Sequence, residues 1–317
     1  MSIARDLFTL MFFPAGLGLL AAGLLFQWVD RKLLARFQNR LGPRWFQPFA
    51  DVVKLLGKEE IQPQGANPLL FAALPIIALA GALAAALAVP LFGLPPVFSY
   101  PGDLIVTLYL LSLLTLCIGL AGAQTRDRFS LTGALRVFTQ LFAYEAPFIL
   151  ALLTPAVALM LAGAGGSWQI NELAQSAAAR AWFALTLPIT FVVALIGLMG
   201  KLELPPFDAP EAETEIVAGA LTEYSGRGLA LFTLARAVEL VVGLMLVTAL
   251  YLGGTGQGAL AAVLFTAKAL GLLLVVVVLQ TVLARLRIDQ TVNLWWRLGS
   301  VLVIGQWLLI VLFRVLQ

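Results

Sequence analysis

The sequence predicts an all-α polytopic membrane protein with about eight transmembrane helices. The chain has 317 residues, of which 61% are hydrophobic and only 12% are charged. A soluble domain carries about twice that share of charged residues. Apolar runs of about 20 residues recur along the chain, and each is long enough to cross a bilayer as a helix. A membrane β-barrel would instead alternate apolar and polar residues in short strands, a pattern that this sequence lacks.

The predicted spans divide a single transmembrane domain that covers residues 1–317. The first span is too long for a cleaved signal peptide, and its basic residues follow it instead of preceding it. The eight spans cover residues 7–29, 68–93, 103–123, 141–164, 182–200, 229–253, 259–283 and 298–316.

Basic residues are concentrated in alternate connections, which predicts the orientation of the chain. Fifteen Lys and Arg residues lie in the connections 30–67, 124–140, 201–228 and 284–297, whereas the other side has only Arg5, Arg180 and Arg314. By the positive-inside rule, the four basic connections face the cytoplasm. We therefore expect a multi-pass protein of the inner (cytoplasmic) membrane with both termini on the outer side.

The first inner connection, residues 30–67, resembles a set of amphipathic surface helices. "VDRKLLARFQNR" places Leu33, Leu34 and Phe37 on one side of a helix, and "LGPRWFQP" interrupts it with Gly and Pro. "FADVVKLLGKEE" forms a second amphipathic segment. Two interpretations stay open: anchoring at the membrane interface, and a docking surface for a cytoplasmic partner.

The cysteine and histidine counts argue against a redox centre in this chain. There is one cysteine, Cys117, and there is no histidine. One cysteine cannot by itself ligate an iron–sulfur cluster, and histidine ligation of haem or metal is excluded. We expect no cofactor and no metal site here, so electrons would travel through other subunits.

The connection "PPFDAPEAETEIVAGALTEYSG", residues 205–226, holds five acids and no base: Asp208, Glu211, Glu213, Glu215 and Glu223. The spacing of Asp208 and Glu211 predicts a capped helix start. If that helix continues, Glu211, Glu215 and Glu223 fall within an arc of about 120°, with Glu213 on the other side. Like charges this close disfavour ionisation, so some of these acids would hold protons, as a proton relay requires.

Four further ionisable residues lie within the predicted spans: Glu145, Arg236, Glu239 and Lys268. Each is costly at bilayer depth unless it is paired or hydrated. Arg236 and Glu239 are three residues apart, so they are expected to pair on one helix face, either structurally or as part of an ion path. Glu145 favours a proton path, and Lys268 is either a mobile proton carrier or a partner for an acid in another chain.

Four segments resemble the complex I subunit 1 family. They are the acidic stretch, "QNRLGP" with "QPFADVVKLLGKEEIQP", "GALRVFTQLFAYEAP", and "RLRIDQ", and they follow the order of that family. The family comprises the quinone-site membrane subunit (the H-type subunit) of NADH–quinone oxidoreductases and the membrane anchor of energy-converting group 4 [NiFe]-hydrogenases.

The resemblance implies two groups of functional residues. A proton path would include Glu145, Glu211, Glu213, Glu215, Glu223, Arg236, Glu239 and Lys268. The junction with the peripheral arm would include Arg40, Asp51, Lys54, Glu59, Arg136, Lys201, Glu203 and Asp208. Expected partners are hydrogenase large and small subunits or their complex I equivalents, antiporter-like membrane subunits and the lipid bilayer, but no nucleic acid. [NiFe] and iron–sulfur clusters would belong to those partner subunits.

Three departures from the quinone-reducing branch favour the hydrogenase branch, of the CO-induced or ferredoxin-linked type. In "GKLELPPFD", Lys201 stands where that branch has Glu, and Glu203-Leu204 stand where it has Asn-Arg. Arg236 replaces an acid of the sixth span. The alternative is the quinone-site subunit, which predicts a wide tunnel between the first span and the acidic loop, whereas the hydrogenase anchor predicts a narrowed one. An independent secondary transporter and a purely structural anchor are further alternatives.

Overall fold

The computed structural model describes residues 8–162, 167–179, 183–254 and 258–315, and these residues form helices and connections without any strand. In chain order the helices are α2 (Gly16–Phe37), α3 (Gln47–Leu56), α4 (Pro68–Ala88), α5 (Asp103–Gln124), α6 (Arg128–Leu161), α7 (Ile170–Ala179), α8 (Phe183–Thr186), α9 (Pro188–Lys201), α10 (Glu213–Ile216), η1 (Gly219–Leu221), α11 (Gly226–Val247), η2 (Thr248–Leu252), α12 (Ala259–Val282), α13 (Ile288–Asn293), η3 (Leu294–Gly299) and α14 (Ser300–Val315). The predicted all-α fold is confirmed.

Seven helical segments in the described part of the chain are long and apolar enough to cross a membrane. The fifth predicted span, residues 182–200, is not one helix of that length: its described residues are divided into the four-residue α8 and the 14-residue α9. Helix α9 alone is about 21 Å long, against a hydrocarbon core of about 30 Å. The cause is Pro188, which disfavours a helical conformation at Leu187 and separates α8 from α9.

Two spans start earlier than the hydropathy pattern indicates. The 34-residue α6 begins at Arg128, so most of the predicted connection 124–140 is helical. Asp127 caps its start by accepting a hydrogen bond from the Ser130 amide at 2.9 Å. The last span runs from Ile288 through η3 into α14. The first turns of these helices are polar and precede the apolar runs. Hydropathy alone therefore does not detect them.

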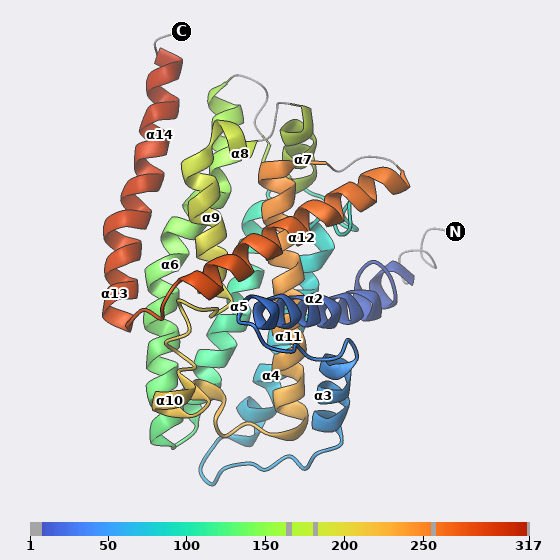
Figure 1. Cartoon of the computed structure of the whole chain (residues 1–317), viewed down its shortest axis with the longest axis vertical. Helices are drawn as coiled ribbons and strands as arrows, with labels where there is room; N and C mark the ends of the chain where they lie inside the picture. Colours follow the sequence, from blue (N-terminus) through green and yellow to red (C-terminus); the bar gives the residue numbers. More distant parts are fainter. Residues whose placement is uncertain (1–7, 163–166, 180–182, 255–257, 316–317) are drawn as a thin grey trace.

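The N-terminal helix α2 continues through the segment that was expected to form a separate surface helix. It ends at Phe37, after the basic residues Arg31, Lys32 and Arg36. Figure 1 shows α2 lying across α11 instead of alongside it. The next segment, α3, is the predicted amphipathic helix, with Val52 buried and Val53 exposed.

Helix α11 forms the centre of the bundle. Every residue from Ala237 to Tyr251 is buried, and α11 contacts α2, α3, α4, α5, α9 and α12 (Figure 1). Gly23 of α2 lies so close to α11 that an added Cβ would meet the Ala237 carbonyl oxygen at 2.8 Å. Small residues permit such close helix crossings in membranes. Any charged side chain on the buried part of α11 is therefore enclosed by other helices.

The acidic connection is not one continuous helix. It contains the four-residue α10 and the single turn η1, and the chain folds back between them at Val217 and Gly219, which have positive φ angles. A Cβ at Gly219 would lie 2.1 Å from the Pro210 carbonyl oxygen. The predicted arc of Glu211, Glu215 and Glu223 on a single helix face is therefore wrong, because that face does not exist.

Candidate functional site

The central feature of the site is a charge network around Arg236 of α11. Its guanidinium bonds to Glu203 Oε2 at 2.9 Å, and its other terminal nitrogen pairs with Glu211. Glu203 is almost fully buried, whereas Glu211 is partly exposed. Arg236 thus joins a buried carboxylate to one that solvent can reach.

A second, fully enclosed ion pair lies beside Arg236. Lys201 Nζ, at the C-terminal end of α9, is 3.5 Å from Glu239 Oε1, and both side chains are only 2% exposed. The predicted pair between Arg236 and Glu239 is therefore wrong. Their spacing does place both on one side of α11, but each finds its ion-pair partner in the segment 201–211, which packs against that side.

The network is held together by hydrogen bonds from α6. Gln140 donates to the carbonyl oxygens of Gly200 at 2.9 Å and of Phe207 at 2.8 Å. These bonds fix both ends of the short segment that carries Lys201 and Glu203. A buried glutamine therefore positions the charges without contributing one.

The network has polar atoms that no described residue satisfies. Glu203 Oε1 and Glu239 Oε1 are buried without a hydrogen bond among the described residues. Both carboxylates line a small cavity of about 10 Å³, together with Thr115, Lys201 and Arg236. This is close to the space that one water molecule needs, so one water could join the two halves of the network.

Burial controls the protonation of Glu203. Removal from water raises the pKa of Glu203 to about 7, and the neighbouring Arg236 guanidinium opposes this shift. The negative charge of Glu211 raises the pKa further. Glu203 can therefore gain or lose a proton close to neutral pH.

A larger cavity of about 440 Å³ opens beside the network, between α2, the segment 202–211 and α11. It includes Asp30 of α2, which is 9% exposed and accepts a hydrogen bond from Gln280 of α12 at 3.4 Å. Asp30 was not among the predicted site residues, because it stands directly before a basic run. A lone acid at the end of the first predicted span was the feature of the sequence that could have identified it. The charged residues that line the cavity are Asp30, Arg31, Glu203, Asp208, Glu211, Arg236 and Arg285.

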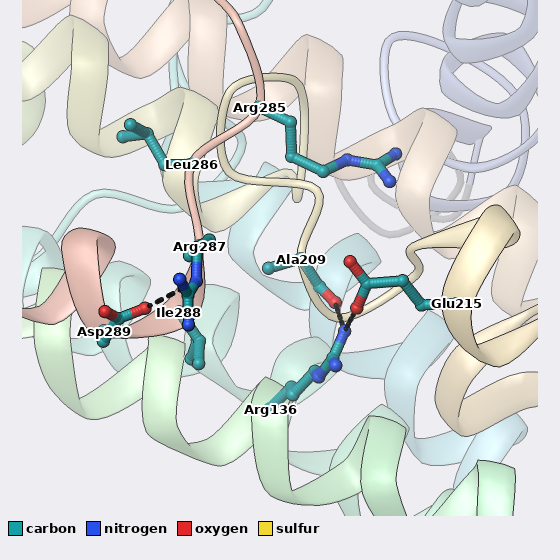
Figure 2. A pocket seen from close by; sticks show the side chains of 8 residues that line it. All are labelled: Arg136, Ala209, Glu215, Arg285, Leu286, Arg287, Ile288 and Asp289. Carbon is teal, nitrogen blue, oxygen red and sulfur yellow. Dashed lines mark hydrogen bonds and ion pairs between the residues drawn. The ribbon is translucent and has the colours of Figure 1, made fainter.

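A second cavity, of about 470 Å³, lies between α6, the acidic connection 205–226 (the acidic loop) and the connection 283–287 before α13. Arg136 of α6 pairs with Glu215 at 2.7 Å and donates to the Ala209 carbonyl at 3.1 Å. Figure 2 shows Arg136 pointing at both groups, while Arg287 turns toward Asp289. Arg285 lines both this cavity and the one beside the Arg236 network.

Asp208 does not cap a helix, as its spacing predicted. Its carboxylate accepts a hydrogen bond from Arg285 Nε at 2.7 Å, and α10 starts five residues later without a side-chain cap. The pair links the acidic loop to the connection before α13. A tertiary ion pair has replaced the local capping bond here.

The residues predicted for the junction separate into paired and exposed groups. Asp51 pairs with Arg31 at 3.6 Å, and Arg40 bonds to Gln38. The Glu59 carbonyl accepts a hydrogen bond from Ser225 at 3.3 Å, which ties the first connection to the start of α11. Lys54 is exposed on α3.

Several predicted path residues form no ion pair with the Arg236 network among the described residues. Glu145 of α6 and Glu223 are half-buried, and neither forms a hydrogen bond or ion pair through its side chain with another described residue. Lys268 donates to the carbonyl oxygens of Leu252 at 3.0 Å and Gly253 at 3.2 Å, beyond the C-terminal end of α11. The side chain of Glu213 lies outside the described residues. Within the described part of the chain, no cluster of His, Cys, Asp or Glu is arranged to hold a metal ion.

Comparison with known proteins gives consistent results. A family model described as NADH dehydrogenase matches residues 9–311. The chain is similar to the H-type subunit of the NADH-quinone oxidoreductase of Thermomicrobium roseum, with 33% identity over 295 residues and coverage of 85% of each chain. It also shares its fold with a chain of the membrane-bound sulfane sulfur reductase, an archaeal respiratory membrane complex. That match has a TM-score of 0.83 and 23% identity, and it covers 97% of this chain and 99% of the other.

Proposed function

Because the chain belongs to the NADH dehydrogenase subunit 1 family and is a membrane subunit of a complex I-like respiratory complex, we propose that it conducts protons beside a docked electron-transfer module. The observation that carries the proposal is that the Arg236 group, which reaches the partly exposed Glu211, and the enclosed Lys201–Glu239 pair meet at one small cavity. No atom of this chain needs to carry an electron in this scheme.

The charge balance of the network supports a role in proton movement. It contains the two cations Lys201 and Arg236 and the three carboxylates of Glu203, Glu211 and Glu239. With every group ionised the network carries one net negative charge, and a proton on Glu203 neutralises it. An additional negative charge nearby would favour the protonated form of Glu203 further, since like charges disfavour ionisation.

The proposed steps of proton uptake and release follow from this charge balance. An electron that reaches the docked module adds negative charge outside Glu211, so Glu203 takes up a proton from the hydrated side of the network. When that charge leaves, Glu203 releases the proton toward Glu239 through the small cavity between them. Arg236 and Lys201 hold the carboxylates in place throughout, which keeps the path in one geometry.

We further propose that the complex is an energy-converting hydrogenase of the CO-induced or ferredoxin-linked type. Lys201 is enclosed and paired with Glu239, so the lysine that departs from the quinone-reducing branch is a working part of the network. The neighbouring cavity of about 440 Å³ has seven charged residues in its lining, which suits water and ions better than an apolar quinone. Partners in this proposal are hydrogenase large and small subunits that hold [NiFe] and iron–sulfur clusters on the cytoplasmic face, together with antiporter-like membrane subunits.

One observation favours the quinone-site alternative. The same cavity lies between the first helix and the acidic loop, where a quinone tunnel was expected, and its volume falls within the range of about 300–1,000 Å³ that ligand pockets occupy. Leu202, Leu204 and Leu240 add apolar surface to it. The two alternatives therefore differ in what enters this cavity.

The intact complex, purified from membranes, distinguishes them. It is assayed for hydrogen evolution with reduced viologen and for quinone reduction with NADH and a short-chain quinone. Hydrogen evolution with bound nickel, without quinone reduction, is the expected result. Inhibitor-sensitive quinone reduction would instead assign the chain to the quinone-reducing branch, with Lys201 tolerated at a working quinone site.

A further inference from the structure

An apolar pocket lies at the end of the bundle opposite the acidic loop, and the charge network does not use it. Its volume is about 360 Å³. The last turns of α6, the short α8, the start of α9 and the second half of α14 form its walls. In Figure 1 this region is the upper end of the bundle, where α14 stands at the edge beside α8 and α9. We call it the lateral pocket.

The short α9 explains why the lateral pocket exists. Helix α9 begins only after the break at Leu187, and α8 before the break has only four residues. These two helices leave a gap between α6 and α14, and this gap is the pocket. The walls there are mainly apolar, with Leu159, Phe183 and Ile310 among them. The hydroxyl of Thr186 already donates to the Phe183 carbonyl at 3.4 Å. A ligand of this pocket must therefore be largely hydrocarbon.

One polar group in the pocket lacks a partner. The side chain of Gln306 is only 7% exposed, and it forms no hydrogen bond with any described residue. The next residue, Trp307, also lies on the inner side of α14, and its indole N–H donates to Thr154 Oγ1 at 2.8 Å. Buried amides normally find partners because an unsatisfied one is costly. The Gln306 amide thus points to a ligand with a hydrogen-bonding group.

The pocket is continuous with the surface that faces the bilayer. Leu309 lines the pocket and is 43% exposed, and Leu308 and Leu312 on the same helix are more exposed still. Ala162 follows the last residue of α6, and Phe183 begins α8, so the residues that face Gln306 across the pocket lie at the ends of their helices. Because a spanning helix ends near the membrane surface, this places the amide near that boundary, where the ester groups of lipids lie.

We propose that the lateral pocket binds one acyl chain of a membrane phospholipid, with the Gln306 amide donating a hydrogen bond to its ester carbonyl. The hydrocarbon chain fills the gap beside α9, and the headgroup stays at the membrane surface on the side away from the acidic loop. The bound lipid completes the packing between α14 and the rest of the bundle. A transmembrane helix of a neighbouring subunit is the competing occupant.

The probe is a phosphatidylcholine that carries a photoactivatable diazirine on one acyl chain. The purified intact complex is reconstituted into nanodiscs that contain this lipid, irradiated, digested and analysed by mass spectrometry. Labelling is expected to concentrate on residues 158–162 and 306–310, well above the labelling around Val263, which is 64% exposed on α12.

Three variants sharpen the result. Ala158→Phe fills the pocket and is expected to reduce labelling there about tenfold, because a packed ring excludes the acyl chain. Gln306→Leu keeps the volume but removes the amide, and one lost hydrogen bond corresponds to about fivefold weaker labelling. Val263→Phe is the matched control on an open lipid-facing surface, and it should leave labelling of the pocket unchanged.

Two results would overturn the proposal. The first is labelling of the pocket that equals the Val263 background or that persists in Ala158→Phe. The second is a crosslink from position 309 to a neighbouring subunit without lipid labelling, which would assign the pocket to a protein helix. If Ala158→Phe does not assemble, Leu309→Trp blocks the pocket from its exposed mouth and tests the same exclusion without altering buried packing.

Discussion

The middle of helix α11 and the segment just beyond its C-terminal end treat buried charge differently. In the middle, Arg236 and Glu239 meet side chains of opposite charge from the segment 201–211. Beyond the end, Lys268 of α12 meets the backbone carbonyls of Leu252 and Gly253. The first arrangement consists of titratable side chains, whereas the carbonyl oxygens that accept hydrogen bonds from Lys268 do not titrate. The difference teaches that charged residues within the spans of one chain can have partners of different chemistry, and we expect the Arg236 network, rather than these contacts of Lys268, to take part in proton movement.

The largest expected effect follows from breaking the enclosed pair. Lys201→Met leaves the Glu239 carboxylate buried without its cation, which typically costs about 3–5 kcal/mol of stability. We expect a large drop in the apparent melting temperature of the purified complex and loss of proton translocation in proteoliposomes. The double variant Lys201→Met/Glu239→Gln should recover most of the stability but not the translocation. Lys54→Met, at an exposed position of α3, is the matched control, and an equal loss of stability in it would contradict this interpretation.

The second prediction concerns pH and Glu203. Because the folded protein raises the pKa of Glu203 to about 7 from an ordinary value of 4.5, the folded state binds more protons than the unfolded state between these values. Stability is therefore expected to fall as pH rises from about 4.5 to 7, by up to about 3 kcal/mol, and to level off above pH 7.

Glu203→Gln removes this titration. Its melting temperature, measured from pH 5 to 8, should be flatter than that of the unaltered protein, and its proton translocation should be lost. Asp289→Asn changes a carboxylate that is 61% exposed and serves as the control. An unchanged pH profile in Glu203→Gln would exclude Glu203 as the group responsible.

The third prediction tests the contacts of Lys268 beyond the C-terminal end of α11. Lys268→Met removes two charge-assisted hydrogen bonds to carbonyls, which should lower stability by about 1–3 kcal/mol. Proton translocation, measured at equal electron-transfer rate, should be retained because these carbonyls carry no exchangeable charge. Loss of translocation in Lys268→Met would show that Lys268 is a mobile proton carrier and would remove the contrast between the Arg236 network and the contacts of Lys268.

The fourth prediction separates path residues from structural ones. Glu145→Gln and Glu215→Gln should each reduce proton translocation while leaving hydrogen evolution by the complex unchanged, and a purely structural anchor would show no change in either activity. Glu145 lacks an ion pair with the described residues, so its substitution should affect stability little. Glu215→Gln also breaks the partly exposed pair with Arg136, worth about 1 kcal/mol or less.

The smallest effect is expected for the exposed pair of Arg287 and Asp289. Their side chains are 82% and 61% exposed and 3.5 Å apart. Arg287→Ala should change stability by less than about 1 kcal/mol and should leave translocation unaffected. A larger loss, in thermal unfolding or in complex assembly, would indicate that a partner subunit covers this side of the cavity in Figure 2.

The sequence by itself determined the fold class, the family and most of the spans. Hydropathy along a helix is a local property, because the bilayer requires about 20 apolar residues wherever a helix crosses it. It failed at Pro188, where a backbone break matters more than composition, and at α6, whose polar first turns extend the helix. The acidic stretch contributes Glu211 to the Arg236 network, as expected of carboxylates beside a span, which are costly unless they have partners.

Only the tertiary structure decided which charges meet. Local rules paired Arg236 with Glu239 and made Asp208 a helix cap, whereas the folded chain pairs them with Glu203, Lys201 and Arg285. Asp30 lines the cavity although its place before a basic run did not mark it as a site residue. The physical reason is that an ion pair depends on the approach of segments far apart in the chain. That approach is set by the packing of α2 and α9 on α11 and of α6 on α9, which no local pattern of residues contains.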